Sequence, residues 1–177
     1  MAKYQNNKIG ILGGSFDPVH KGHLIISKIA LRKINLKKIY WIVAKRNPFK
    51  KKPLYPLEKR LLLARKITKN IKKINVLYLD DVVKSSRSID VIKYILKRYK
   101  TKDIYFIIGS DILLELHKWK SWKRIVKLTK LIVFSRKGYD RSRKDSVVAK
   151  YLNNKKITFI KNKRINISSS SLRRNIK

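Results

Sequence analysis

The sequence predicts an α/β fold, with a doubly wound and mostly parallel sheet of about six strands. Short apolar runs alternate with amphipathic runs, which is the pattern of strands joined by crossover helices. The apolar runs carry few polar residues, which is typical of strands covered on both faces. No repeat or linker interrupts the pattern, so we expect residues 1–177 to form a single domain.

The first three elements follow the N-terminal residues. Lys8–Leu12 is a largely apolar run that ends at two glycines, and it is predicted to be a strand. Gly22–Ile34 is predicted to be a helix, because apolar residues recur along one face. This stripe consists of Ile25, Ile26, Ile29, Ala30 and Ile34. Ile39–Ala44 has the composition of a buried strand.

A basic loop separates this strand from the next helix. The loop, Lys45–Pro56, contains three of the four prolines of the chain, which oppose regular structure. Leu57–Thr68 then has helical periodicity. Its expected inner face is Leu57, Leu61 and Ala64, with Leu63 and Ile67 as further candidates. Ile74–Leu79 is predicted to be the third strand.

The second half of the chain repeats the alternation. Ser88 is expected to cap a helix that runs to Tyr99. Its inner face would be Ile92, Ile95, Leu96 and Tyr99. The remaining strands are predicted at Ile104–Ile108, which ends at Gly109, at Leu131–Phe134 and at Ile157–Ile160. Ligands of such sheets bind beyond the carboxyl ends of the strands, so the segments that follow the strands are the candidates for a site.

The charge of the chain is strongly positive. Lysine and arginine total 47 against 10 acidic residues, a formal net charge of +37. Such an excess can indicate binding to a polyanion such as nucleic acid. The cations are spread along the whole chain, however, which favours a solvated basic surface, and we expect no specific nucleic-acid partner. A positive field would in either case attract anionic nucleotides.

Composition also excludes several classes of site. The chain has no cysteine, which excludes disulfides and thiolate metal sites. Its first seven residues lack the apolar core of a signal peptide, and no apolar run approaches the roughly 20 residues that span a bilayer. We therefore expect a soluble protein of the cytoplasm that has no membrane partner.

The loop after the first strand contains the most informative residues. It reads Gly13-Gly14-Ser15-Phe16-Asp17-Pro18-Val19-His20-Lys21-Gly22-His23. The paired glycines permit a tight turn and close approach of the backbone to a ligand. The following helix start offers free N–H groups, which suit phosphate. His20 and His23 share one face of that helix, where both rings can donate to phosphate oxygens, and Gly22 leaves room for a flat base.

This string resembles the Gly-(Gly/Thr)-Phe-Asp-Pro-x-His-x-Gly-His signature of the nucleotidyltransferase superfamily, whose fold is Rossmann-like. The resemblance implies in-line attack of a substrate phosphate on the α-phosphorus of ATP, without a covalent enzyme intermediate. His20 and His23 would be catalytic, because they would stabilise charge on the phosphates. Gly13, Gly14, Ser15, Phe16 and Gly22 would line the nucleotide. Mg²⁺ would enter with ATP, held mainly by phosphates and water and not by a protein metal site.

A second motif lies near the carboxyl end of the chain. Residues 167–173 read Ile-Ser-Ser-Ser-Ser-Leu-Arg, which has the composition of a helix start rich in hydroxyl caps. It resembles the second superfamily signature, Ile-Ser-Ser-Thr-x-Ile-Arg. The resemblance implies that Ile167, Ser168 and Ser169 bind the nucleotide phosphates. Arg173 would be the third catalytic residue, stabilising the leaving pyrophosphate.

The middle of the chain resembles one family within the superfamily, the bacterial nicotinate-nucleotide adenylyltransferases. Residues 107–119 are similar to their Ile-Gly-x-Asp pattern with a following tryptophan, and residues 131–139 to their Arg-x-Gly-Tyr segment. Residues 86–90 resemble Ser-Tyr-Thr-x-(Asp/Gln), with Arg87 in place of the tyrosine, and Asn47-Pro48-Phe49-Lys50 resembles a substrate loop. The implied substrates are ATP and nicotinate mononucleotide.

The resemblance also implies the residues that bind this second substrate. Trp119 would stack on the pyridine ring, and the backbone N–H groups of Ser88 and Lys120 would bind the pyridine carboxylate. Arg136 and Lys50 would bind the mononucleotide phosphate. Asp111 would contact the sugar or order its loop. Gly109 and Asn47 complete the set implied by the same motifs.

Other interpretations of these residues stay open at this stage. The second substrate could be nicotinamide mononucleotide or phosphopantetheine, or the chain could be a non-catalytic module that binds nucleic acid through its basic surface. Trp119 and Trp122 could be core aromatics of a helix, and for Trp122 we prefer that interpretation. Glu115 and His117 lie two residues apart, so they do not face each other as an acid–base pair.

Overall fold

A computed structural model of the chain describes residues 7–46, 52–139 and 142–161. It contains a six-stranded sheet in the order β3-β2-β1-β4-β5-β6. Every neighbouring pair of strands in this sheet is parallel. The strands are β1 (Ile9–Gly14), β2 (Lys38–Val43), β3 (Ile74–Leu77), β4 (Ile104–Gly109), β5 (Lys130–Phe134) and β6 (Ile157–Ile160). The predicted fold class and all predicted strands are confirmed, and no strand end differs from its predicted position by more than two residues.

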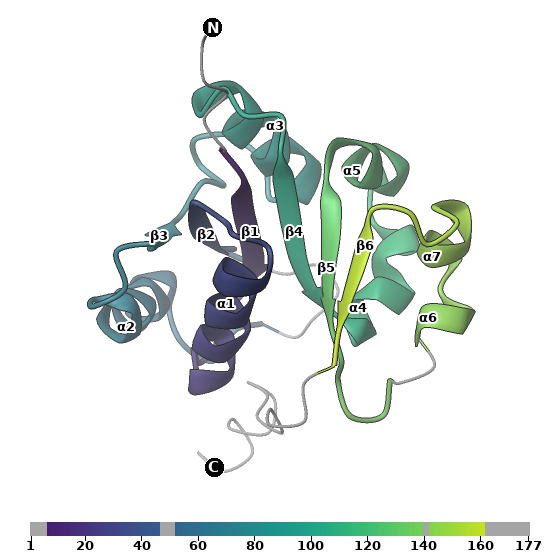
Figure 1. Ribbon diagram of the computed structural model, residues 1–177. Coiled ribbons are helices and arrows are strands. Elements are labelled where there is room, and N and C mark those ends of the chain that lie inside the picture. The colour runs from purple at the N-terminus through teal and green to yellow at the C-terminus, as the bar shows by residue number, and fades with distance from the viewer. Residues whose placement is uncertain (1–6, 47–51, 140–141, 162–177) are drawn as a thin grey trace, which may run out of the picture.

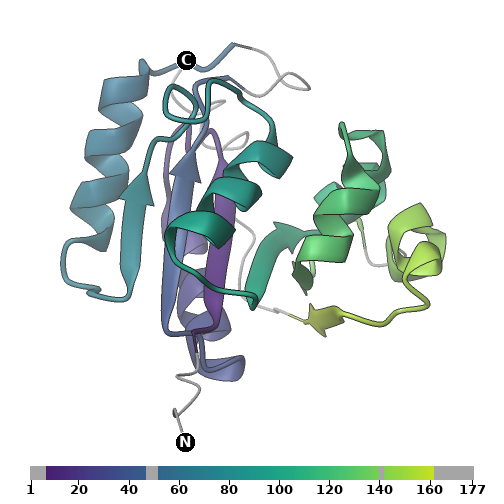
Figure 2. The same cartoon turned by 90° about the horizontal axis from the view of Figure 1, so that it is seen from above.

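Helices cover both faces of the sheet (Figures 1 and 2). They are α1 (Lys21–Lys33), α2 (Leu57–Thr68), α3 (Ser88–Arg98), α4 (Ser110–Glu115), the 3₁₀ turn η1 (Leu116–Lys118), α5 (Trp122–Leu128), α6 (Ser142–Asp145) and α7 (Val147–Tyr151). Helices α1 and α2 pack in one core cluster, and α3, α4, α5 and α7 contribute to the other. Successive residues of β5 alternate between the clusters, since Leu131 belongs to one and Ile132 to the other. This alternation explains why the strand sequences are apolar throughout.

The predicted stripe of α1 is confirmed except at one residue, because Ala30 belongs to one core cluster and Ile26, Ile29 and Ile34 pack against it. Gly22, Ser27 and Ala30 are its buried residues, whereas Ile25 does not belong to either core cluster. Ser27 is buried because its hydroxyl accepts a hydrogen bond of 2.8 Å from the Trp41 indole N–H. A buried indole N–H needs such an acceptor, and hydrophobic periodicity does not record that need.

Two other helix predictions need correction. On α2, Arg60 and Thr68 are buried together with Ala64, although the periodicity selected only apolar residues. Ser88 does not cap α3, because it is the first helical residue and Arg87 occupies the cap position. The predicted inner face of α3 is confirmed. Ile92 and Ile95 are buried, Leu96 and Tyr99 pack at the edge of the cluster, and Ile89 and Val91 are buried as well.

The strand order places the candidate site. The order reverses between β1 and β4, which are direct neighbours in the sheet. Loops from these two strands leave the sheet toward opposite faces, which opens a space beyond their carboxyl ends. The loop of residues 15–20, after β1, and α4, after β4, therefore start on either side of the position where such folds bind nucleotides.

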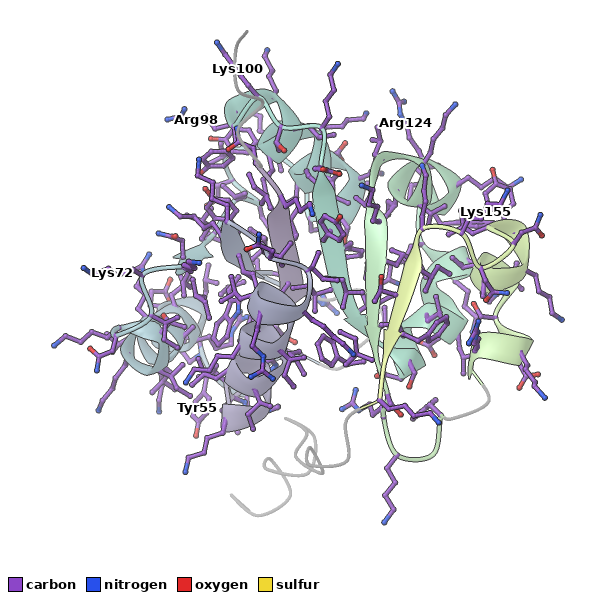
Figure 3. The ribbon with its side chains drawn as sticks, viewed as in Figure 1. Tyr55, Lys72, Arg98, Lys100, Arg124 and Lys155 are labelled. Atoms are coloured by element: carbon purple, nitrogen blue, oxygen red, sulfur yellow. The ribbon has the colours of Figure 1, made fainter. Side chains whose placement is uncertain are left out.

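Cationic side chains surround the fold. Figure 3 labels Lys72, Arg98, Lys100, Arg124 and Lys155, which project outward from separate parts of the molecule. The labelled cations therefore come from several separate elements and do not form one stripe. No helix in the described part of the chain is long and apolar enough to cross a membrane.

Candidate active site

Two histidine rings lie together at the start of α1. His20 is the residue before the helix and His23 is in its first turn, with ring centroids 3.9 Å apart. The backbone N–H of His20 donates to Nδ1 of His23 over 3.2 Å. Because Nδ1 accepts this bond, the proton of a neutral His23 ring resides on Nε2. The predicted pairing of the two histidines is confirmed, and His23 keeps a ring N–H as a donor.

His20 has an unusual electrostatic environment. Burial, and to a smaller extent the positive charge of Arg136, lower its pKa to about 4. The ring is therefore neutral near pH 7. Its Nδ1 is buried and finds no hydrogen-bond partner within the described residues. His20 can thus offer a hydrogen bond to a phosphate, but it does not act as a permanent cation.

A pair of stacked aromatic rings, Phe16 and Trp41, packs against the histidine pair. Phe16 is 2% exposed, and its ring lies parallel to Trp41 with centroids 5.1 Å apart. The same ring lies 4.8 Å from the His23 ring. Phe16 has a positive φ of 48°, which is uncommon for a residue with a side chain and persists only where the surroundings hold it. The packing of Phe16 therefore fixes the turn that carries the histidines.

This finding corrects the reason given for the two glycines. Gly13 and Gly14 do not have positive φ, and the left-handed conformation in this loop falls on Phe16 instead. A Cβ on Gly13 would meet its nearest atom only at 4.0 Å, on Phe106. Local packing therefore does not require glycine at position 13. Close approach of a ligand to the exposed backbone stays the predicted reason for this residue and for its neighbours Gly14 and Ser15.

The loops after β4 and β5 meet on the other side of His20. Arg136, after β5, forms an ion pair with Asp111 in the first turn of α4, and its backbone N–H donates to Ser110 Oγ over 3.0 Å. A Cβ on Gly109 would lie 2.3 Å from Oδ1 of Asp111, so a side chain there would displace the Asp111 carboxylate. Arg136 also acts on His20 electrostatically. The structure thus brings His20, Asp111 and Arg136 together, and the Asp111 ion pair favours its predicted role in ordering the loop.

The predicted pyridine site lies at the margin of the core. Trp119 is half-buried, and its ring meets Phe106 edge to face with centroids 6.3 Å apart. Trp122 packs on Tyr151 at 5.1 Å and belongs to the core margin, as preferred from the sequence. Within the described residues, no backbone carbonyl accepts from the N–H groups of Ser88 or Lys120. Both N–H groups are therefore available, and their role in binding the pyridine nucleotide stays a prediction.

Six of the predicted residues lie outside the described part of the chain. They are Asn47, Lys50, Ile167, Ser168, Ser169 and Arg173. The serine-rich helix start at 167–173 belongs to the same group.

Sequence reasoning missed three buried charged residues beside the site. Asp17 is 1% exposed, and its carboxylate accepts from the N–H groups of Leu54 and Tyr55 at 2.8 and 2.9 Å. Asp80 is 8% exposed and accepts from the Lys45 N–H at 2.9 Å. The third residue is Arg60. Its place on the apolar stripe of α2 was a signal, because an arginine on an inner helix face needs buried acceptors.

A polar hollow lies next to these residues. It has a volume of about 480 Å³ and is formed where the segments after β2 and β3 face each other. Its lining is Lys45, Arg46, Asp80, Asp81, Lys84, Ser85 and Ser86. Burial raises the pKa of the Asp80 carboxyl, while the hydrogen bond from Lys45 opposes that change. The hollow offers cations, carboxylates and hydroxyls, and so suits a polar ligand.

Comparisons with known proteins agree with this architecture. The model of the cytidylyltransferase-like family matches residues 11–175. A Pelagibacter ubique (strain HTCC1062) protein named "Probable nicotinate-nucleotide adenylyltransferase" is 44% identical, over 98% of this chain and 99% of that protein. A protein of the same name from Endomicrobium trichonymphae is 35% identical, over 97% of this chain and 86% of its own length.

Among solved structures, Plasmodium falciparum nicotinic acid mononucleotide adenylyltransferase complexed with NaAD has a similar fold. The TM-score is 0.75 at 22% identity, and the match covers 95% of this chain and 83% of that one. The same enzyme complexed with APC also gives a TM-score of 0.75.

Proposed function

This chain belongs to the nicotinate-nucleotide adenylyltransferases, and we propose that it transfers the adenylyl group of ATP to nicotinate mononucleotide in NAD biosynthesis. The products are deamido-NAD and pyrophosphate. The observation that carries the proposal is the meeting of the His20–His23 pair with the Arg136–Asp111 pair at the switch point of the sheet. The near full-length similarity to proteins named for this reaction supports it.

The reaction needs positioning and charge stabilisation more than covalent chemistry. A phosphate oxygen of nicotinate mononucleotide attacks the α-phosphorus of ATP, and the bond from that phosphorus to the bridging oxygen of pyrophosphate breaks. The attacking oxygen is already anionic, so no base has to remove a proton. Negative charge moves onto the leaving pyrophosphate, and donors that face it lower the barrier.

The histidine pair is placed to supply such donors. Nδ1 of His23 accepts from the His20 backbone N–H, so the proton of the neutral ring resides on Nε2, and the N–H groups of the first turn of α1 lie beside it. His20 adds a neutral ring, which donates without the strong binding of ground-state phosphates that a cation would give. Arg173 would complete the set from the carboxyl-terminal motif.

We propose that Mg²⁺ accompanies ATP. Mg²⁺ binds oxygen ligands and keeps several waters, so the triphosphate and water would hold most of its coordination positions. When bound, Mg²⁺ would neutralise part of the triphosphate charge.

The proposed second substrate carries a pyridine carboxylate. The N–H groups of Ser88 and Lys120 are donors, and an acid presents only acceptors to them. An amide would direct its own N–H toward one of these donors. Trp119 offers an indole face to the pyridine ring. We therefore propose that the enzyme prefers nicotinate mononucleotide to nicotinamide mononucleotide, and that it acts in the cytoplasm.

The test is a two-substrate assay of pyrophosphate release with ATP and Mg²⁺. We expect turnover with nicotinate mononucleotide, at least about tenfold less with nicotinamide mononucleotide, and none with phosphopantetheine. Preference for the amide would overturn the substrate assignment. Silence with every acceptor, together with retained RNA binding, would instead favour the basic module suggested by the charge of +37.

A further inference from the structure

Arg60 of α2 is a buried cation with an unusual set of partners. It is 2% exposed, and neither ion pair among the described residues includes it. Its guanidinium instead donates to four backbone carbonyls. Nε donates to Tyr55 (3.0 Å), Nη1 to Ser15 and Ala44 (both 2.7 Å), and Nη2 to Lys45 (2.9 Å). Four of the five guanidinium N–H groups are thereby used.

The four carbonyls belong to segments that the site needs in a fixed relation. Ser15 lies between β1 and the histidines, and Ala44 and Lys45 directly follow β2. Tyr55 lies two residues before α2, and its own N–H donates to the Asp17 carboxylate of the first loop. One side chain therefore holds the loop of residues 15–20 against both described ends of the connection from β2 to α2.

The peptide group that joins Ala44 to Lys45 is bound at both ends. Its carbonyl accepts from Arg60, and its N–H donates to Oδ2 of Asp80. The cation and the anion therefore lie at the matching ends of the peptide dipole, and each strengthens the hydrogen bond of the other. The carboxylate of Asp80 is also a charge partner of Arg60, which eases the burial of the guanidinium.

The peptide group that joins Ser15 to Phe16 is also bound by Arg60, but only at its carbonyl end. In a trans peptide the carbonyl and the N–H point in opposite directions. Because Arg60 binds the Ser15 carbonyl, the Phe16 N–H points away from Arg60. No backbone carbonyl of the described residues accepts from that N–H. It is thus a spare donor in the loop that leads to the histidines, at a residue whose φ of 48° has to be held in place.

We propose that Arg60 is a positioning residue for the adenylyl transfer, which fixes the Ser15–Phe16 peptide and the end of β2 so that the Phe16 N–H and the His20–His23 pair are preorganised for the nucleotide phosphates. This inference rests on the proposed function. Lysine cannot replace the arginine, because an ammonium group cannot reach four separated carbonyls as a planar fork does.

The first test compares Arg60→Lys with Ala64→Gly. Ala64 is buried one turn further along the same helix and has no side-chain polar group, so its glycine variant is a matched control for lost stability. Both are assayed well below their Tm. We expect kcat of Arg60→Lys to fall by about 10- to 100-fold, the size expected for small misplacement of reacting groups. Ala64→Gly should keep kcat within about twofold, as expected for a change that acts on folding stability alone.

The second test needs no turnover. The chain has three histidines, so the imidazole NMR signals of His20, His23 and His117 can be assigned by substitution. His117 lies on η1, away from Arg60, and serves as an internal reference. Arg60→Lys should shift the signals of His20 and His23 and leave that of His117 in place, whereas Ala64→Gly should move none of them.

The outcomes separate the two proposals. A wild-type chain that transfers no adenylyl group overturns the proposed function, while the histidine signals still decide whether Arg60 positions the loop. Wild-type kcat and unchanged histidine signals in Arg60→Lys would overturn the positioning role. If that variant does not fold, Asp80→Ala, which frees the N–H end of the Ala44–Lys45 peptide, replaces it. The same shifts at smaller size are then expected, and their absence would refute the inference.

Discussion

The two sides of the candidate site are held in different ways. On the β1–β2 side, Arg60 and Asp17 are almost completely buried, and the bonds described for their side chains end on backbone groups. On the β4–β5 side, the Arg136–Asp111 pair is partly open to solvent, with side-chain exposures of 41% and 18%. A ligand phosphate cannot compete for the first set of bonds without unfolding the loop. It can compete for Arg136, because a partly exposed ion pair contributes little to stability and exchanges partners readily.

This difference suggests that the two sides of the site have different roles. The β1–β2 side is a preformed support for the histidines. On the β4–β5 side, Arg136 can exchange its ion pair with Asp111 for an ion pair with a substrate phosphate. Variants on the two sides should therefore differ in whether they change turnover or substrate affinity.

The largest effect is expected on the fixed side. His23→Ala removes a donor from the preformed pair, and we expect kcat to fall by at least about 100-fold with little change in Tm, as for other preorganised charge-stabilising donors. Steady-state kinetics and thermal unfolding measure the two quantities. Unimpaired turnover would show that the pair does not face the reacting phosphates.

Arg136→Ala should act mainly on affinity. We expect KM for nicotinate mononucleotide to rise by about tenfold, since a charge-assisted contact is lost. The same variant should raise the His20 pKa, because Arg136 now lowers it. An NMR titration of His20 checks the second statement. A His20 pKa that stays near 4 would leave burial as the sole cause.

Trp119→Ala tests the pyridine side alone. Loss of the indole face should raise KM for nicotinate mononucleotide several-fold, up to about tenfold, in line with the value of aromatic contacts. KM for ATP should stay within about twofold. Equal weakening of both substrates would mean that Trp119 acts through the core contact with Phe106.

The smallest effect concerns acid stability. The pKa of His20 is about 4 in the fold and 6.5 without its environment. The folded state therefore disfavours the protonated ring, and stability is lost as the pH falls from about 6.5 toward 4. His20→Asn should flatten this part of the pH profile, measured by urea unfolding at several pH values. A control, Lys155→Gln, changes one exposed charge at a site away from the histidines and should leave the slope unchanged.

Much of the fold and part of the site could be predicted from sequence. The strands were found because their apolar runs need only local information, and the spacing of His20 and His23 fixed their shared face. The motif resemblance also selected Gly109, Asp111 and Arg136, which the structure brings together. The tight-turn explanation for Gly13 and Gly14 was wrong. The positive φ of this loop falls on Phe16, where packing of the Phe16 ring against Trp41 and His23 holds it.

The sequence alone therefore determined the alternation of strands and helices, the family and the histidine pair, because each is encoded within a short window of residues. Only the tertiary structure decided which polar side chains are buried. Arg60 reaches the Ser15 carbonyl across 45 positions of sequence, and Asp17 reaches Leu54 across 37. Burial of Ser27 likewise depends on a distant partner, because its hydroxyl accepts a hydrogen bond from the Trp41 indole N–H. Burial of a polar group is favourable only where distant partners satisfy it, and a local pattern cannot show where those partners will be.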